Sequence, residues 1–224
     1  MIKAVIFDHD GVIADTEPIH FIADNAVLAR YGFNISAEAN DSLVGISTKK
    51  SWEILREMFK IPEAAEWLAE EKTSAAAGII EKEGIAPNDG LLPLLERLHI
   101  KGYMLAIASG QYRKIIDAVL AKLRIGRYFS VIVSAEDTIL GKPNPEVFLT
   151  AAKRLAVKPE ECLVIEDSGL GVMAAKAAGM ACVALRTAST ASHDISIADL
   201  VVNSLAELNT GLSMEERIKV KRKQ

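Results

Sequence analysis

The sequence predicts an α/β fold, a doubly wound parallel sheet with a helical domain inserted after its first strand. Short apolar runs recur along the chain and are nearly continuous, which is typical of strands covered on both faces. Helical patterns separate most of these runs, and strands that alternate with helices favour a parallel sheet. A third observation is residues 18–83, which contain no convincing strand and indicate the insertion.

The strands come first in this prediction. The first, 3–7, reads KAVIF and is β-branched or apolar apart from its opening lysine. The other expected strands are 103–109, 131–135, 162–166, 182–185 and 200–202.

The helices of the core are expected between these strands. Residues 112–126 repeat apolar side chains at helical spacing, so that one face of the helix is apolar. Proline near the first turn of 144–157, and glycine at the end of other segments, are typical helix boundaries. The expected core helices are 89–102, 112–126, 144–157 and 168–180.

The insertion is predicted to be a separate helical domain. Its helical stretches are 19–32, 47–59 and 62–84. We therefore expect an α/β core formed by residues 1–15 and 84–224, and a helical domain formed by residues 16–83.

Composition limits the classes of partner. The 224 residues include 26 Lys and Arg against 30 Asp and Glu, a net charge of −4, so no basic field favours nucleic acid. The basic tail, 217–224, is expected to be a solvated end. No apolar stretch approaches the ~18 residues of a membrane span. Cys162 and Cys182 lie in apolar runs, so we expect buried free thiols and a reducing cytoplasm. We also expect the protein to be a monomer.

Polar side chains follow several of the expected strands. Ligands of open parallel sheets gather beyond the carboxyl ends of the strands, so these side chains should converge. Carboxylates, a hydroxyl and a lysine together suit Mg²⁺ and a phosphate group. The set is Asp8, Asp10, Ser109, Lys142, Glu166 and Asp167.

Each member of this set also has an ordinary explanation. The two aspartates could belong to a strand-terminating loop, and Ser109 could cap a helix beginning near Gln111. Lys142 could be an exposed lysine, and the residues after 162–166 could cap the next helix. Their joint occurrence in this order, at these strand ends, favours a site.

The motifs that carry this set resemble a known family. FDHDGV (7–12), ASGQ (108–111), GKPNPEVF (141–148) and VIEDSGLGVMAAKAAGM (164–180) are similar to the four motifs of the haloacid dehalogenase superfamily. The nearest resemblance is to its branch of β-phosphoglucomutase-like and small-phosphate phosphatases, and it extends from residue 2 to about residue 186. The resemblance implies a Rossmann-like core, and the insertion resembles the helical cap of that branch.

The resemblance also implies roles in a reaction. Asp8 would be the nucleophile that becomes an aspartyl phosphate, and Asp10 would be the acid and base. Ser109, Gly110 and Lys142 would hold the phosphoryl oxygens that are not transferred.

The same resemblance implies a Mg²⁺ site formed by Asp8, the backbone carbonyl of Asp10, Glu166 and Asp167. His9 departs from the family pattern, which has an apolar residue between the two aspartates. We expect a structural role for His9 rather than a role as metal ligand, because nitrogen donors suit softer metals.

The cap decides which substrate reaches the nucleophile. Thr16, His20 and Lys72 match the β-phosphoglucomutase pattern and favour a sugar phosphate or a similar small phosphate as substrate. Thr48 stands where the mutase has an arginine that grips a second phosphate. Lys49 could replace it only in part, because a lysine lacks the bidentate geometry of arginine.

We therefore expect a Mg²⁺-dependent phosphatase that hydrolyses a small phosphorylated metabolite. A β-phosphoglucomutase-type isomerase is the main alternative. Dehalogenation is disfavoured, because such enzymes need no carboxylates for magnesium and Glu166 and Asp167 are present. A binding or regulatory protein with an idle site is the non-enzymatic alternative.

Overall fold

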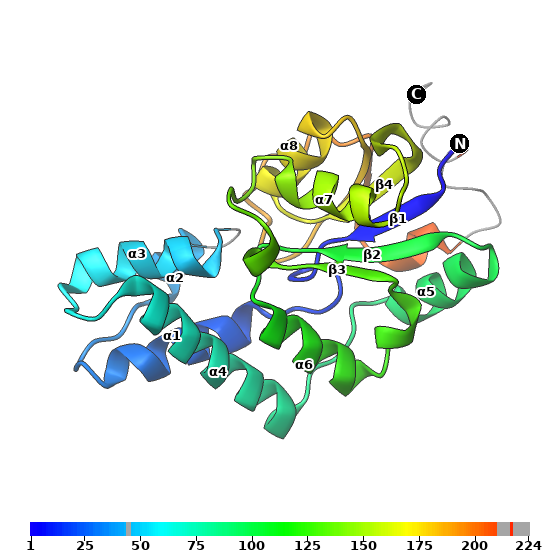
Figure 1. Ribbon diagram of the computed structural model, residues 1–224. Helices are drawn as coiled ribbons and strands as arrows, with labels where there is room; N and C mark the ends of the chain where they lie inside the picture. The colour runs from blue at the N-terminus through cyan, green and yellow to red at the C-terminus, as the bar shows by residue number, and fades with distance from the viewer. Residues whose placement is uncertain (44–45, 210–215, 217–224) are drawn as a thin grey trace.

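The computed structural model describes residues 1–43, 46–209 and 216, and its centre is a parallel sheet of six strands (Figure 1). The strand order across the sheet is β3-β2-β1-β4-β5-β6. The order reverses between β1 and β4, which is where open α/β sheets bind ligands. The strands are β1 (Ala4–Phe7), β2 (Met104–Ala108), β3 (Val131–Val133), β4 (Cys162–Glu166), β5 (Ala181–Leu185) and β6 (Leu200–Val202).

β1 lies in the middle of the sheet because all four of its side chains are apolar and buried. Phe7 is in register with Ile107 of β2 on one side and with Ile165 of β4 on the other. The residues that follow these three strands therefore emerge side by side at one edge of the sheet, as the sequence predicts.

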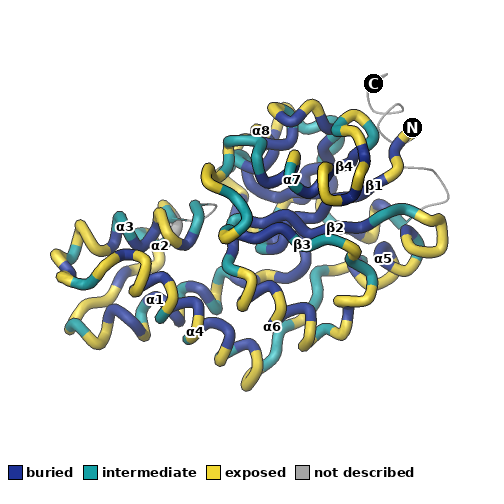
Figure 2. Tube along the Cα trace, in the orientation of Figure 1, coloured by how far each residue is buried: buried dark blue, intermediate teal, exposed yellow. Residues whose placement is uncertain are grey.

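Helices cover both faces of the sheet (Figure 1). α5 (Leu91–Ile100) and α6 (Arg113–Leu123) pack on the face that contains Phe7. α7 (Glu146–Arg154) and α8 (Gly169–Ala177) pack on the opposite face with Ile6. The central strands β1 and β4 are consequently buried along their whole length, whereas the first two residues of the edge strands β3 and β6 are only half-buried (Figure 2). Each fully buried Leu, Ile or Phe in these layers stabilises the fold by about 1.5–3 kcal/mol.

The cap consists of α1 (Glu17–Ala29), α2 (Ala37–Asp41), α3 (Thr48–Phe59) and α4 (Ala65–Glu83). It has a hydrophobic cluster of its own, centred on Trp52 and including Leu55 and Leu68. The C-terminal half of α4 packs differently, because Ala76 and Ile80 belong to the cluster of the core. α4 thus contributes side chains to the hydrophobic clusters of both units.

Several elements differ from the sequence-based expectations. The short helix α2 was not expected, and β3 ends at Val133, two residues early, because Ser134 caps a 3₁₀ turn over Ala135–Asp137. Cys162 and Cys182 are buried free thiols, as predicted. The basic tail at 217–224 lies outside the described residues. Within the described part of the chain, no helix has the length and apolarity needed to cross a membrane.

Candidate active site

A tight turn after β1 places Asp8 at the edge of the sheet. The Asp8 amide donates to the Ile165 carbonyl at 2.9 Å, which continues the pairing with β4 by one residue. Gly11 has a φ of +71°, and a Cβ at this position would lie 2.0 Å from Oδ2 of Asp167. Only glycine permits this close approach. The turn therefore brings the first and fourth motifs together.

Lys142 reaches the same point from the loop after β3. Its Nζ lies 2.8 Å from Oδ1 of Asp8 and also forms an ion pair with Oε1 of Glu166. All three side chains are buried. Burial raises the pKa of Asp8 to about 8; the charge of Lys142 opposes this rise, and the negative charge of Glu166 adds to it. A single lysine thus faces a group of crowded carboxylates.

The carboxylates of Asp8, Glu166 and Asp167 offer oxygen atoms that all lie within 4.8 Å of one another. Burial, followed by the negative charges of Glu166 and Asp8, raises the pKa of Asp167 well above its ordinary value. Such repulsion between buried oxygen donors is relieved by a hard divalent cation. The residues present therefore fit Mg²⁺.

Glu166 is already engaged by protein groups. Its Oε2 accepts hydrogen bonds from the amides of Asp167 (2.7 Å) and Ser168 (2.6 Å), and its Oε1 meets Lys142. A Cβ at Gly171 would collide with Oε1, so glycine is needed there as well. These contacts let Glu166 fix the position of Lys142 and of the loop after β4.

Ser109 follows β2 beside Asp8. Its amide donates to the Val133 carbonyl at 3.0 Å, and its Oγ accepts from the Gln111 amide at 3.1 Å. A hydroxyl can accept and donate at the same time, so Oγ keeps its own hydrogen for a ligand. Ser109 and Gly110 line the same pocket as Asp8 and Lys142.

Asp10 is the most densely hydrogen-bonded carboxylate of the pocket. Oδ1 accepts from Thr16 Oγ1 (2.6 Å), His9 Nδ1 (2.9 Å) and His20 Nε2 (3.2 Å). Oδ2 accepts from Nε2 of Gln111 at 2.9 Å. Burial alone would raise the pKa of Asp10, but His20 and His9 outweigh burial and hold the pKa well below its ordinary value. The structural role expected for His9 agrees with this contact.

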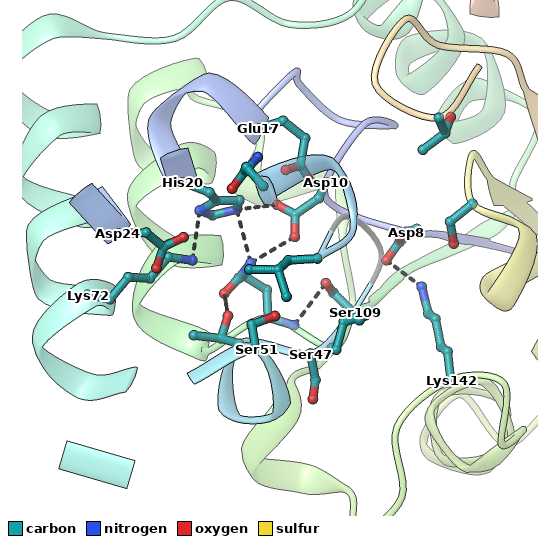
Figure 3. A pocket seen from close by; sticks show the side chains of 18 of the residues that line it. Asp8, Asp10, Glu17, His20, Asp24, Ser47, Ser51, Lys72, Ser109 and Lys142 are labelled. Atoms are coloured by element: carbon teal, nitrogen blue, oxygen red, sulfur yellow. Dashed lines mark hydrogen bonds and ion pairs between the residues drawn. The ribbon is translucent and has the colours of Figure 1, made fainter. Parts of the chain in front are cut away.

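Lys72 fixes the state of His20 (Figure 3). Its Nζ, which can only donate, lies 3.1 Å from Nδ1 of His20, so the ring hydrogen belongs on Nε2. Nε2 lies 3.2 Å from Oδ1 of Asp10 and 3.0 Å from Nε2 of Gln111. Burial and the charge of Lys72 lower the pKa of His20, which favours the neutral ring. In Figure 3, Asp10 lies between the His20–Lys72 pair and the Asp8–Lys142 pair.

The predicted cap residues divide into two groups. Thr16, His20 and Lys72 converge on Asp10 as described, and Thr48 lines the pocket. Lys49 does not line it: its side chain is half exposed and pairs with Glu66 at 3.0 Å on the surface.

Several further residues line the pocket without having been assigned to it from the sequence, among them Glu17, Asp24 and Gln111. Burial and the charge of Asp10 raise the pKa of Glu17 to about 7. Asp24 is four residues after His20, and this helical spacing is a signal that could have identified it. Gln111 lies inside the second motif, but its side-chain direction follows only from the fold.

Comparison with known proteins gives a consistent result. The family model described as "Haloacid dehalogenase-like hydrolase" matches residues 5–185. The chain is 34% identical to the fructose-1-phosphate phosphatase YqaB of Escherichia coli, over 81% of this chain and 95% of that protein. It is also 34% identical to the β-phosphoglucomutase of Bacillus subtilis, over 96% and 95% of the two chains. The crystal structure of β-phosphoglucomutase from Clostridium difficile superposes with a TM-score of 0.84 at 30% identity, covering 100% of both chains.

Proposed function

Because this chain belongs to the haloacid dehalogenase-like hydrolases, in their β-phosphoglucomutase-like phosphatase branch, we propose that it hydrolyses a small phosphomonoester, a sugar phosphate, with Mg²⁺. The pocket that supports this proposal holds a nucleophile, a separate acid and base, and one phosphate cradle. Its lining combines the core loops after β1, β2, β3 and β4 with side chains of the cap.

The reaction begins with attack of an Asp8 carboxylate oxygen on phosphorus. Asp10, which rests as a carboxylate, first takes up a proton from solvent; the bond from phosphorus to the ester oxygen then breaks, and that oxygen takes this proton. A water molecule then attacks the aspartyl phosphate, Asp10 takes up its proton, and phosphate leaves with Asp8 restored. Ser109, Gly110 and Lys142 hold the other phosphoryl oxygens and stabilise their charge.

Asp8, the backbone carbonyl of Asp10 and Asp167 would hold Mg²⁺, with Glu166 supporting the site. When bound, the ion neutralises negative charge between carboxylate and phosphoryl oxygens. Lys142 supplies the complementary positive charge from the chain itself.

One observation favours a phosphatase over a mutase: the described pocket has a lysine beside the nucleophile at its core end, and the lysine at its cap end is surrounded by carboxyl groups. Besides Lys142, the cationic side chain lining the described pocket is Lys72, which is engaged with His20. Glu17 and Asp24 are the acidic side chains beside it, and neither offers a positive charge to a second phosphate. A mutase must hold a bisphosphate at both ends, and Lys49 points away from the pocket.

The test uses purified protein with Mg²⁺ and a panel of phosphate esters that includes fructose 1-phosphate. We expect release of inorganic phosphate, and we expect Asp8→Asn to abolish it. β-Glucose 1-phosphate with a trace of glucose 1,6-bisphosphate examines the mutase alternative. Formation of glucose 6-phosphate without free phosphate would contradict the phosphatase assignment.

A further inference from the structure

Gln111 is a buried polar residue at the boundary between core and cap that the roles above leave unexplained. Its residue exposure is 6%, and its backbone is held on both sides. The amide donates to Oγ of Ser109 at 3.1 Å, and the carbonyl accepts from the Ala135 amide at 2.9 Å. The side chain therefore extends from a backbone that is fixed by two hydrogen bonds, directly beside Ser109 and Gly110.

The Gln111 side chain contacts both units of the protein. Nε2 donates to Oδ2 of Asp10 in the core at 2.9 Å and also lies 3.0 Å from Nε2 of His20 in α1 of the cap. Oε1 accepts from Oγ1 of Thr48 at 2.6 Å, and Thr48 is the first residue of α3 in the cap. A continuous path of two hydrogen bonds thus joins the cap helix to the catalytic carboxylate.

This path exists only while the cap lies on the core. The segment before α3 touches the core loops: Ser47 lies next to Gly110 and Gly141, and an added Cβ on either glycine would come within 3.9 Å of it. The hydroxyl of Thr48 is carried by the same segment. Movement of the cap away from these loops would remove the hydroxyl and leave Oε1 of Gln111 without this partner.

The two oxygens of Asp10 depend on different parts of the chain. Oδ1 has three donors, two of which, His9 and Thr16, are close to Asp10 in sequence. Among the described residues, the donor assigned to Oδ2 is Gln111. The orientation of Oδ2 therefore depends on the position of the Gln111 amide, and two cap residues, Thr48 and His20, contact that amide.

We propose that Gln111 is a positioning residue that couples cap closure to the orientation of the Asp10 carboxylate. This inference rests on the proposed phosphatase function. With the cap closed, Thr48 fixes the amide of Gln111, and the amide fixes Asp10 for proton transfer to the leaving oxygen. With the cap open, the amide can rotate, and Asp10 loses its alignment. Proton transfer is thereby confined to the closed pocket, where bulk water is excluded.

If Gln111 only filled space, its replacement should lower kcat/KM equally for substrates with good and with poor leaving groups. A positioning role predicts a larger loss for the poor leaving group. The value of kcat/KM reports the steps up to departure of the leaving group. p-Nitrophenolate leaves without a proton, whereas a sugar alkoxide needs one. Misplacing Asp10 should therefore reduce kcat/KM for the sugar phosphate much more than for p-nitrophenyl phosphate.

The experiment compares Gln111→Met, which keeps the length of the side chain, with Thr48→Val, which removes only the hydroxyl. With Mg²⁺, we expect Gln111→Met to lower kcat/KM for the best sugar phosphate by roughly 30-fold, and for p-nitrophenyl phosphate by less than about 3-fold. Thr48→Val should lower kcat/KM for the sugar phosphate by roughly 5-fold and spare p-nitrophenyl phosphate in the same way. Thr48→Ser, which keeps the hydroxyl, should have the kcat/KM of the wild type. The double variant should be no worse than Gln111→Met alone, since Thr48 acts through Gln111.

Equal losses on both esters in Gln111→Met would overturn the inference, as would additive effects in the double variant. If Gln111→Met does not fold, Gln111→Glu takes its place: it keeps an acceptor for Thr48 but has no donor for Asp10, so the same selective loss is expected. A wild-type protein that hydrolyses neither ester would instead contradict the proposed function itself.

Discussion

Replacement of Lys142 by methionine tests how the buried charges of the site are balanced. Lys142 contacts Asp8 at 2.8 Å and pairs with Glu166, whose side chain has no exposed surface. Removing one partner of a buried ion pair leaves an uncompensated charge and destabilises a protein by about 3–5 kcal/mol. We expect a loss of this size in the metal-free protein, which corresponds to a fall in Tm of roughly 10 °C for a chain of this length.

The assay is thermal unfolding in EDTA and in Mg²⁺, followed by circular dichroism. Mg²⁺ should raise the Tm of Lys142→Met more than that of the wild type, because the ion supplies positive charge where the lysine is missing. Lys49→Met is the matched control: its ion pair with Glu66 is half exposed, so its loss should cost less than about 1 kcal/mol. If the two variants were equally stable in EDTA, Lys142 would not be needed to balance the negative charge of the buried carboxylates, contrary to the expectation.

Three more predictions concern the turn, the nucleophile and the cap. Because the pKa of Asp8 is raised from 3.8 to about 8, the metal-free folded protein holds this proton more tightly than the unfolded chain does. The associated stability is complete at low pH and is lost as the pH rises towards about 8, so Asp8→Asn should remove a slope of about 1.4 kcal/mol per pH unit from urea unfolding in EDTA. Gly11→Ala would put a Cβ 2.0 Å from Asp167, so we expect a loss of Mg²⁺ affinity of at least about 10-fold by calorimetry; Gly32→Ala, with a similar φ and open space around it, should keep that affinity. Trp52→Phe removes the indole N–H that donates to the buried carboxylate of Asp24 in α1, and should lower the free energy of unfolding in urea by about 1–3 kcal/mol. The Mg²⁺ affinity of this variant should stay that of the wild type.

The core of this fold could be read from the sequence because its signals are local. β1 is a short apolar run that ends abruptly in Asp8, and such a run has few alternatives to a buried strand. Parallel strands then bring their carboxyl ends to one edge without any further information. The sequence therefore predicts that Asp8, Ser109 and Glu166 lie together at this edge.

The cap was less predictable because the orientation of a helix is not a local property. Thr48 and Lys49 are neighbours in sequence, but adjacent residues on an α-helix point about 100° apart. α3 packs through Trp52 and Leu55, and this packing turns Thr48 into the pocket and Lys49 towards solvent. Which of the two faces the substrate depends on tertiary contacts that no periodicity reveals.

The polar network around Asp10 was hidden for a different reason. Gln111 and Asp10 are separated by a hundred residues, and a glutamine in a loop carries no pattern that indicates a partner. In isolation Gln111 is an ordinary polar residue, but within the fold its burial requires both ends of its amide to be satisfied. The requirement that buried polar groups be paired is what makes its contacts with Thr48 and Asp10 informative.

The distribution of charge along the pocket links the site to its substrate. At the core end, Lys142 and the oxygen donors for Mg²⁺ favour a phosphate group, whose charge they can neutralise. At the cap end, Lys72 is offset by Glu17 and Asp24, so a second phosphate would meet carboxylates rather than free cations. Hydroxyl groups can both donate to these carboxylates and accept from Lys72. The pocket is thus polar at both ends but favours an anionic group only at the core end. This asymmetry suits a polyol with a single phosphate, and it opposes binding of a bisphosphate in two opposite orientations.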